Sequence, residues 1–216
     1  NDAIIVSGDT KVVPRGAVDK IFINTTGIGE VLYGGINSNN ITQDDLILVS
    51  RDIGAHGATI FTAREGMDMH SNLKSDCNSL YPQVKALIDS GVKITALRDA
   101  TRGGVSAVLN EWAKQSNVCI EIDEEKVPVC DEVKGICEIL GFDAMSLANE
   151  GTFVLAIKKE DAQKALEVLQ TFKEAKTASI IGKVTQQYEQ RVILNSQWGT
   201  KRFLDIPTGE LLPRIC

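Results

Sequence analysis

Residues 92–112 read VKITALRDATRGGVSAVLNEW, and this stretch sets the pattern of the whole fold. Its first six residues form a mostly apolar run of the length that a buried strand needs. Its second half repeats apolar residues at helical spacing, with Val105, Val108, Leu109 and Trp112 on one face. The residues between, 98–104, are mostly polar and end in two glycines. The stretch therefore predicts a strand, a connecting loop and a helix.

The same alternation continues on both sides of this stretch. Further strands are predicted around Cys119 and at 46–50, 152–157, 179–184, 191–194 and 202–206, and further helices at 78–90, 133–140 and 161–174. Gly91 and Gly141 stand where two helices should end, because glycine adopts the left-handed backbone common there. Two more strands are predicted at 3–6 and 20–25. Strand–helix units followed by late strands indicate an α/β (α+β) protein with a layered mixed β-sheet and helices packed on it.

The composition excludes several classes of protein. With 216 residues, 43% of them hydrophobic, the chain has the material for a buried core. Its net charge is −6 and it has no long basic run, which argues against a nucleic-acid surface and an electrostatic membrane anchor. No apolar stretch approaches the length of a membrane span. We therefore expect no nucleic acid and no membrane among its partners.

The five cysteines show no CxxC pair and no zinc-like spacing, and there are two histidines. Free thiols of this kind fit a reducing cytoplasm. Cys137 lies on the apolar face of a predicted helix and Cys119 in a predicted strand, so both are expected in the core. The fifth thiol, Cys216, is the last residue. It is either an accident of a tolerant terminus or a carrier that is modified in one active site and swings into another.

Three other segments combine residues that carry chemistry. SGDTKVV at 7–13 follows a predicted strand, and there Asp9 can bind Mg²⁺ while Lys11 attracts phosphate; the alternative is a polar turn. In 98–104, Asp99 or Thr101 can cap the next helix, and the paired glycines let the backbone approach an anion; the alternative is an ordinary turn. Glu150, between a helix-like segment and a strand, is a candidate general base; the alternative is a cap or a surface residue.

His56 lies between glycines, in IGAHGA at 53–58. Its close backbone environment suits either contact with a ligand or partner, or a structural role in capping a helix.

Taken together, these segments resemble the family of the hydrogenase maturation factor HypE, a carbamoyl dehydratase of the superfamily of aminoimidazole ribonucleotide synthetase and selenophosphate synthetase. The resemblance is carried by GDTKVV at 8–13, RGAVDK at 15–20, ALRDATRGG at 96–104, ANEG at 148–151 and PRIC at 213–216. It implies remnant strands of an N-terminal ATP-binding domain at 1–35, a C-terminal α/β domain at 36–206, and a flexible tail at 207–216 that carries Cys216. One departure is Ala55, before His56, where the family usually has an aspartate.

The resemblance also implies a reaction, with ATP and Mg²⁺ as cofactors. A carbamoyltransferase, HypF, loads a carbamoyl group onto Cys216, ATP phosphorylates its oxygen, and loss of phosphate leaves a thiocyanate. The cyano group then passes to iron on a HypC–HypD complex, to become a cyanide ligand of [NiFe]-hydrogenase. The resemblance implies a homodimer for the full-length protein. It assigns catalysis to Cys216, Lys11 and Glu150, metal binding to Asp9, and nucleotide binding to Asp9, Thr10, Arg98, Asp99, Arg102, Gly103 and Gly104.

Two alternatives stay open. The chain could be a non-catalytic fragment that serves as a docking or carrier module and presents Cys216 to partners. It could instead be another ATP-dependent synthetase of the superfamily, such as a selenophosphate synthetase.

Overall fold

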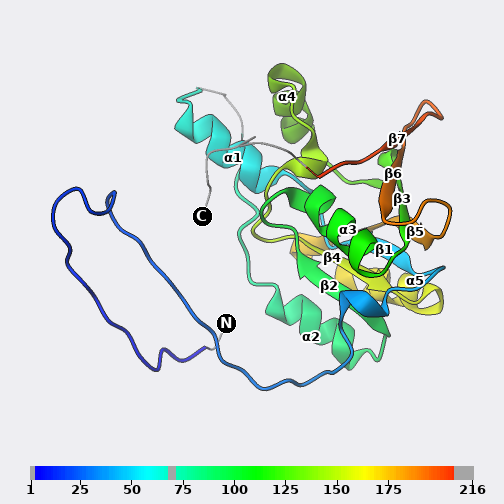
Figure 1. Ribbon diagram of the computed structural model, residues 1–216, viewed down its shortest axis with the longest axis horizontal. Coiled ribbons are helices and arrows are strands. Elements are labelled where there is room, and N and C mark those ends of the chain that lie inside the picture. Colours follow the sequence, from blue (N-terminus) through cyan, green and yellow to red (C-terminus); the bar gives the residue numbers. More distant parts are fainter. Residues whose placement is uncertain (1–2, 68–71, 207–216) are drawn as a thin grey trace. The chain divides into compact units, whose positions relative to one another are not determined.

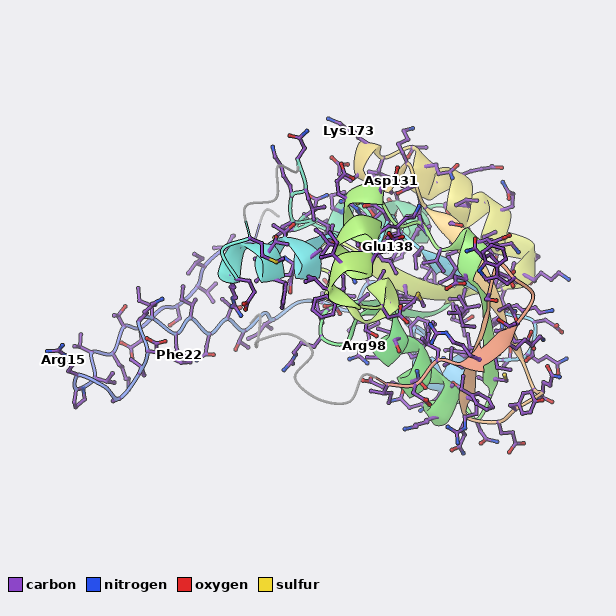
Figure 2. The ribbon with its side chains drawn as sticks, turned by 90° about the horizontal axis from the view of Figure 1, so that it is seen from above. Arg15, Phe22, Arg98, Asp131, Glu138 and Lys173 are labelled. Carbon is purple, nitrogen blue, oxygen red and sulfur yellow. The ribbon has the colours of Figure 1, made fainter. Side chains whose placement is uncertain are left out.

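The computed structural model describes residues 3–67 and 72–206 and divides the chain into two units, Asn1–Gly34 and Gly35–Cys216 (Figure 1). The described part of the first unit contains neither helix nor strand, so the strands predicted at 3–6 and 20–25 are wrong. A strand needs a neighbour for its N–H and C=O groups, and these segments have none in their unit. Their apolar side chains are exposed, as at Ile5 and Phe22; Phe22 and Arg15 are labelled in Figure 2.

The second unit is built on a seven-stranded sheet in the order β2-β4-β1-β5-β3-β6-β7. The strands are β1 (Leu46–Val49), β2 (Ile94–Asp99), β3 (Cys119–Asp123), β4 (Phe153–Ile157), β5 (Ser179–Thr185), β6 (Arg191–Asn195) and β7 (Lys201–Phe203). β3 and β6 pair in parallel, and every other neighbouring pair is antiparallel. All five residues of β4 are buried, because helices cover the sheet on both faces at this point. The predicted mixed sheet is confirmed.

Five α-helices surround the sheet: α1 (Ala55–Arg64), α2 (Tyr81–Asp89), α3 (Gly104–Gln115), α4 (Asp131–Leu140) and α5 (Ala162–Gln170). α3 lies across one face (Figure 1) and buries the predicted apolar stripe, including Leu109 and Trp112, against strand residues such as Ile120. α2 and α5 cover the other face, where Leu87 and Leu169 pack with Leu155. α1 and α4 form a smaller cluster of their own. No helix in the described ranges is long and apolar enough to span a membrane.

The structure corrects several boundaries. β2 extends two residues beyond Leu97, and α5 ends at Gln170, short of the predicted position 174. α1 was not predicted, because its sequence AHGATIFTAR has little amphipathic periodicity. Gly141 ends α4 with a φ of 70°, and Gly91 has a φ of 77° just after α2, so both predicted helix stops are confirmed.

Candidate functional site

Three loops meet at one edge of the sheet. β4 lies between β2 and β1 and runs antiparallel to both. The ends of β1 and β2 therefore lie beside the beginning of β4. This arrangement gathers residues 50–54, 100–103 and 147–152, which we call the loop edge.

Asn149 joins the three loops. Its side chain is fully buried. Its Oδ1 accepts the Gly54 N–H at 2.7 Å, and its Nδ2 donates to the carbonyls of Ala100 and Leu147 at 2.9 and 3.0 Å. One amide side chain thus bonds backbone groups from all three loops, and the Ala100 carbonyl also accepts the Asn149 N–H at 3.1 Å.

Asp76 fixes the backbone directly after Asn149. One carboxylate oxygen accepts the Glu150 N–H at 3.1 Å. The other accepts the Gly151 N–H at 3.0 Å and the Thr152 hydroxyl at 2.8 Å. Asp76 is 3% exposed, and bonds to a charged acceptor are stronger than neutral ones. Sequence analysis missed Asp76, because it lies between irregular residues with no periodic pattern.

Glu150 is therefore held on both sides. Asn149 precedes it in the fully buried amide network, and its own N–H is bonded to Asp76. The residue itself is only partly buried. A carboxylate on a fixed backbone at the rim of a loop cluster suits a group that must meet a substrate from solvent.

The predicted phosphate loop is shorter than expected, because Arg98 and Asp99 belong to β2. Arg98 forms an ion pair with Glu111 on α3, and Asp99 and Arg102 are exposed. We expected Asp99 or Thr101 to cap α3, but neither does. The N-cap is Gly103, with a φ of 75° and no side-chain hydrogen bond. The two arginines are not equivalent, since the Arg98 side chain is paired with Glu111 on α3 and Arg102 is exposed.

Gly104 allows the start of α3 to pack closely against the backbone of a neighbouring turn. A Cβ at this position would lie 2.5 Å from the carbonyl oxygens of both Met145 and Leu147. Its φ of 60° is also unfavourable for other residues. The paired glycines thus bring the start of α3 against the turn at 145–147, which sets the position of Asn149 and Glu150. This packing explains Gly104 without an anion.

The first unit contains Asp9, Thr10 and Lys11. The Lys11 ammonium lies 3.9 Å from an Asp9 carboxylate oxygen, and both side chains are more than three-quarters exposed. An exposed pair at this distance contributes little to stability, so both groups are free to bind a ligand. In the described ranges, no three His, Cys, Asp or Glu side chains cluster as a metal cage would require.

His56 lies in the first turn of α1, and its Nδ1 is 2.8 Å from the Ser75 hydroxyl. Ser75 Oγ also accepts the Cys77 N–H at 3.1 Å. His56 therefore helps to hold the segment that carries Asp76, a structural role. Cys119 and Cys137 are buried, as predicted, and Cys77 is exposed. Cys216 lies outside the described residues.

We expect the buried thiols to react far more slowly than Cys77. Burial, followed by the nearby Asp143 charge, raises the pKa of Cys137 to about 11, and burial raises the pKa of Cys130. Because the thiolate is the reactive form, iodoacetamide at about pH 8 should modify Cys77 well before Cys137. Peptide mass spectrometry over time measures the order, and denatured protein is the control in which the difference should vanish. Equal rates for Cys77 and Cys137 in the folded protein would contradict this assignment.

Several known proteins are similar to this chain in sequence or in structure. The sequence of E. coli carbamoyl dehydratase HypE is 46% identical over 216 aligned residues, which cover 98% of this chain and 62% of the relative. The chain thus spans less than two-thirds of the length of this curated relative. Two solved structures are also similar. A hydrogenase maturation protein HypE in complex with ATP has a TM-score of 0.91 and 39% identity, over 95% of this chain and 63% of the other. A HypE–HypF complex has a TM-score of 0.77 and 40% identity, over 82% and 58%.

These similarities confirm the resemblance to HypE proteins along the whole chain. The model of the family described as AIR synthase related protein, C-terminal domain, matches residues 42–195. These residues contain the sheet from β1 to β6 and all three segments of the loop edge. The matched range covers most of the chain and lies within the second unit described above. The chain therefore belongs to the family of AIR synthase related proteins, to whose C-terminal domain residues 42–195 correspond.

Proposed function

We propose that this chain is part of an ATP-dependent carbamoyl dehydratase that acts in [NiFe]-hydrogenase maturation. The observation that carries the proposal is the 46% identity to the E. coli carbamoyl dehydratase over 98% of the chain. The substrate is a carbamoyl group on the thiol of Cys216. The product is a thiocyanate on the same sulfur, the source of a cyanide ligand for iron.

The chemistry explains why a nucleotide is needed. A carboxamide loses water with difficulty, because oxide is a poor leaving group. ATP supplies a phosphoryl group that turns the carboxamide oxygen into a good leaving group, as phosphate. The similar HypE structure with bound ATP supports nucleotide binding in this fold. The protein must then remove two N–H protons as the C≡N bond forms.

Glu150 and Lys11 are the proposed proton-transfer pair. Glu150 lies on a backbone fixed by Asp76 and Asn149, which gives its carboxylate a defined starting point. Lys11 belongs to the first unit, and its ammonium is exposed beside Asp9. A lysine acts as a base only when burial or a neighbouring cation lowers its pKa.

Asp9 is the proposed Mg²⁺ ligand. Mg²⁺ commonly binds through one or two carboxylates together with substrate phosphates, so a single exposed carboxylate fits and a cage of three is unnecessary. Thr10, Asp99, Arg102 and the Gly103 turn are the remaining proposed contacts to nucleotide. Arg98 and Gly104 remain in this set, although an ion pair with Glu111 and packing on 145–147 engage them here.

The proposed partners follow from the reaction. A carbamoyltransferase of the HypF kind loads Cys216, and the solved HypE–HypF complex supports this pairing. A HypC–HypD complex is the proposed acceptor of the cyano group. We propose a homodimer for the full-length protein, located in the cytoplasm.

The test is a mass map of the intact protein. Incubation with carbamoyl phosphate, ATP and HypF should first add the mass of one carbamoyl group to the peptide that ends in Cys216, and with time the same peptide should lose the mass of one water. The loss of water should stop when ATP and HypF are removed early and resume when ATP alone is added back. The exposed thiol of Cys77 is the internal control and should stay unmodified. No modification, or equal modification of Cys77, would overturn the proposal.

A non-catalytic docking or carrier module is the second candidate. It is favoured by the first unit, where apolar side chains such as Ile5 and Phe22 are exposed. ATP hydrolysis that depends on a loaded Cys216 separates the two, since a docking module would load without hydrolysing ATP.

A further inference from the structure

Two buried polar side chains on α3 have no role in the loop edge. Ser106 is fully buried and Asn110 is 6% exposed. They lie one helical turn apart on a helix whose buried face is otherwise largely apolar. Polar groups in such a place require hydrogen-bond partners.

Both side chains donate to the same short segment, the last one that the structure describes. Asn110 Nδ2 donates to the Leu204 carbonyl at 2.8 Å and to the Ser106 carbonyl at 2.9 Å. Ser106 Oγ donates to the Asp205 carbonyl at 2.8 Å. We call Ser106 and Asn110 the carbonyl clamp.

The carbonyl clamp supplies hydrogen bonds to the backbone just after the last strand of the sheet. β7 is a three-residue strand at the edge of the sheet, and all three residues are exposed. After Phe203 the chain leaves the ladder, although the Leu204 N–H still donates to the Val192 carbonyl at 2.9 Å. Leu204 is 3% exposed and packs in the α3 core. The α3 side chains therefore bond the carbonyls of residues 204 and 205 where the ladder no longer does.

The position of the clamp decides where the terminal segment begins. Ser106 is two residues beyond Gly104, so it lies about 3 Å along the helix axis from the start of α3. The ten residues from 207 to Cys216 can span at most about 35 Å. A segment of limited length gives its end group a high effective concentration only near its origin.

We propose that Ser106 and Asn110 are positioning residues that hold the base of the Cys216 arm beside the 100–103 loop. This inference rests on the proposed function, because it assumes that the thiol carries the substrate. The clamp contacts neither substrate nor nucleotide. It fixes residues 204 and 205, from which the chain continues toward Cys216.

Ser106→Ala and Asn110→Leu test the proposal in the intact protein. Each removes donors while keeping similar size. Freeing residues 204–206 lengthens the arm from ten residues to about thirteen and removes its fixed origin, and effective concentration falls with at least the 3/2 power of length. We expect kcat for dehydration of preloaded protein to fall at least about 1.5-fold in Ser106→Ala and more in Asn110→Leu. The KM for ATP and the rate of loading by HypF should not change.

Ala165→Gly is the matched control. Ala165 is fully buried in α5 against the opposite face of the sheet, so this change lowers stability without touching the clamp. It should leave kcat for dehydration unchanged at a temperature where all variants are folded. Hydrogen exchange of peptide 201–206 should be faster in the clamp variants and unchanged in the control.

The outcomes separate the clamp from the proposed function. Normal loading with an unchanged dehydration rate in both clamp variants would overturn the clamp. An equal loss of loading and dehydration would also overturn it, because that pattern indicates a general loss of structure. Failure of the unsubstituted protein to load would overturn the proposed function and this inference with it. Ser106→Ala removes a single hydroxyl and keeps the test decisive if Asn110→Leu does not fold.

Discussion

Gly151→Ala is expected to destabilise the second unit by more than about 4 kcal/mol, which is exceptional for one substitution. A Cβ at position 151 would lie 1.8 Å from the Asp76 carbonyl oxygen and 2.8 Å from its carbon. These are backbone atoms, so no side-chain rotation relieves the overlap. The segment around Asp76 must move away, which breaks its three hydrogen bonds to residues 150–152.

The measurement is thermal unfolding of the purified chain. The control is a substitution at a glycine that has open space for a Cβ. Gly135 lies inside α4, and a Cβ there would meet nothing within 4 Å. Gly135→Ala should raise stability by about 1 kcal/mol, because alanine favours helix. Gly151→Ala should lower the melting temperature by at least about 8 °C or prevent folding. A melting temperature within about 2 °C of the parent would show that the loop edge accommodates the Cβ with little loss of stability.

Glu150→Gln is expected to slow dehydration by about 10²–10⁴-fold, the usual contribution of a positioned general base. Glutamine has nearly the same shape but cannot take up a proton. The Glu150 N–H bond to Asp76 involves only the backbone, so the substitution leaves it in place. Loading of Cys216 should continue at the parental rate. A single turnover with preloaded protein and ATP, followed by mass spectrometry of the C-terminal peptide, measures the dehydration step alone.

Glu138→Gln is the control for this substitution. Glu138 is an exposed glutamate on α4 (Figure 2), outside the loop edge. It should leave loading and dehydration unchanged. Dehydration by Glu150→Gln at the parental rate would remove Glu150 from the proposed role, and reduced loading would assign it to the carbamoyl transfer instead.

Local periodicity predicted most of the second unit. The apolar spacing from Val105 to Trp112 marks the buried face of α3, and the β4 run is buried on both faces. These predictions succeed because buried residues recur along the sequence with the period of the helix or strand that contains them. The same reasoning failed for residues 3–6 and 20–25, since an apolar run forms a strand only when a neighbouring strand is present.

The candidate site was predictable only in part. Glu150 and the arginines of 98–104 stand out by residue type, so sequence reasoning selected them. Asp76, Asn149 and the carbonyl clamp did not stand out, because their partners lie far away along the chain. Asn110 is 94 residues from Leu204, and Asn149 is 95 residues from Gly54. No local pattern encodes such a contact.

The same separations bear on the order of events in folding. The bond from Asp76 to Thr152 closes a loop of 76 residues, and closing long loops costs chain entropy before any contact repays it. Contacts between distant segments also form slowly. The strand pairs β1–β4 and β1–β5 close loops that are longer still, so the central sheet and the polypeptide around Glu150 should reach their final shape together and late. A partly melted chain that has lost the pairing of β1 with β4 would then have lost its reaction centre as well.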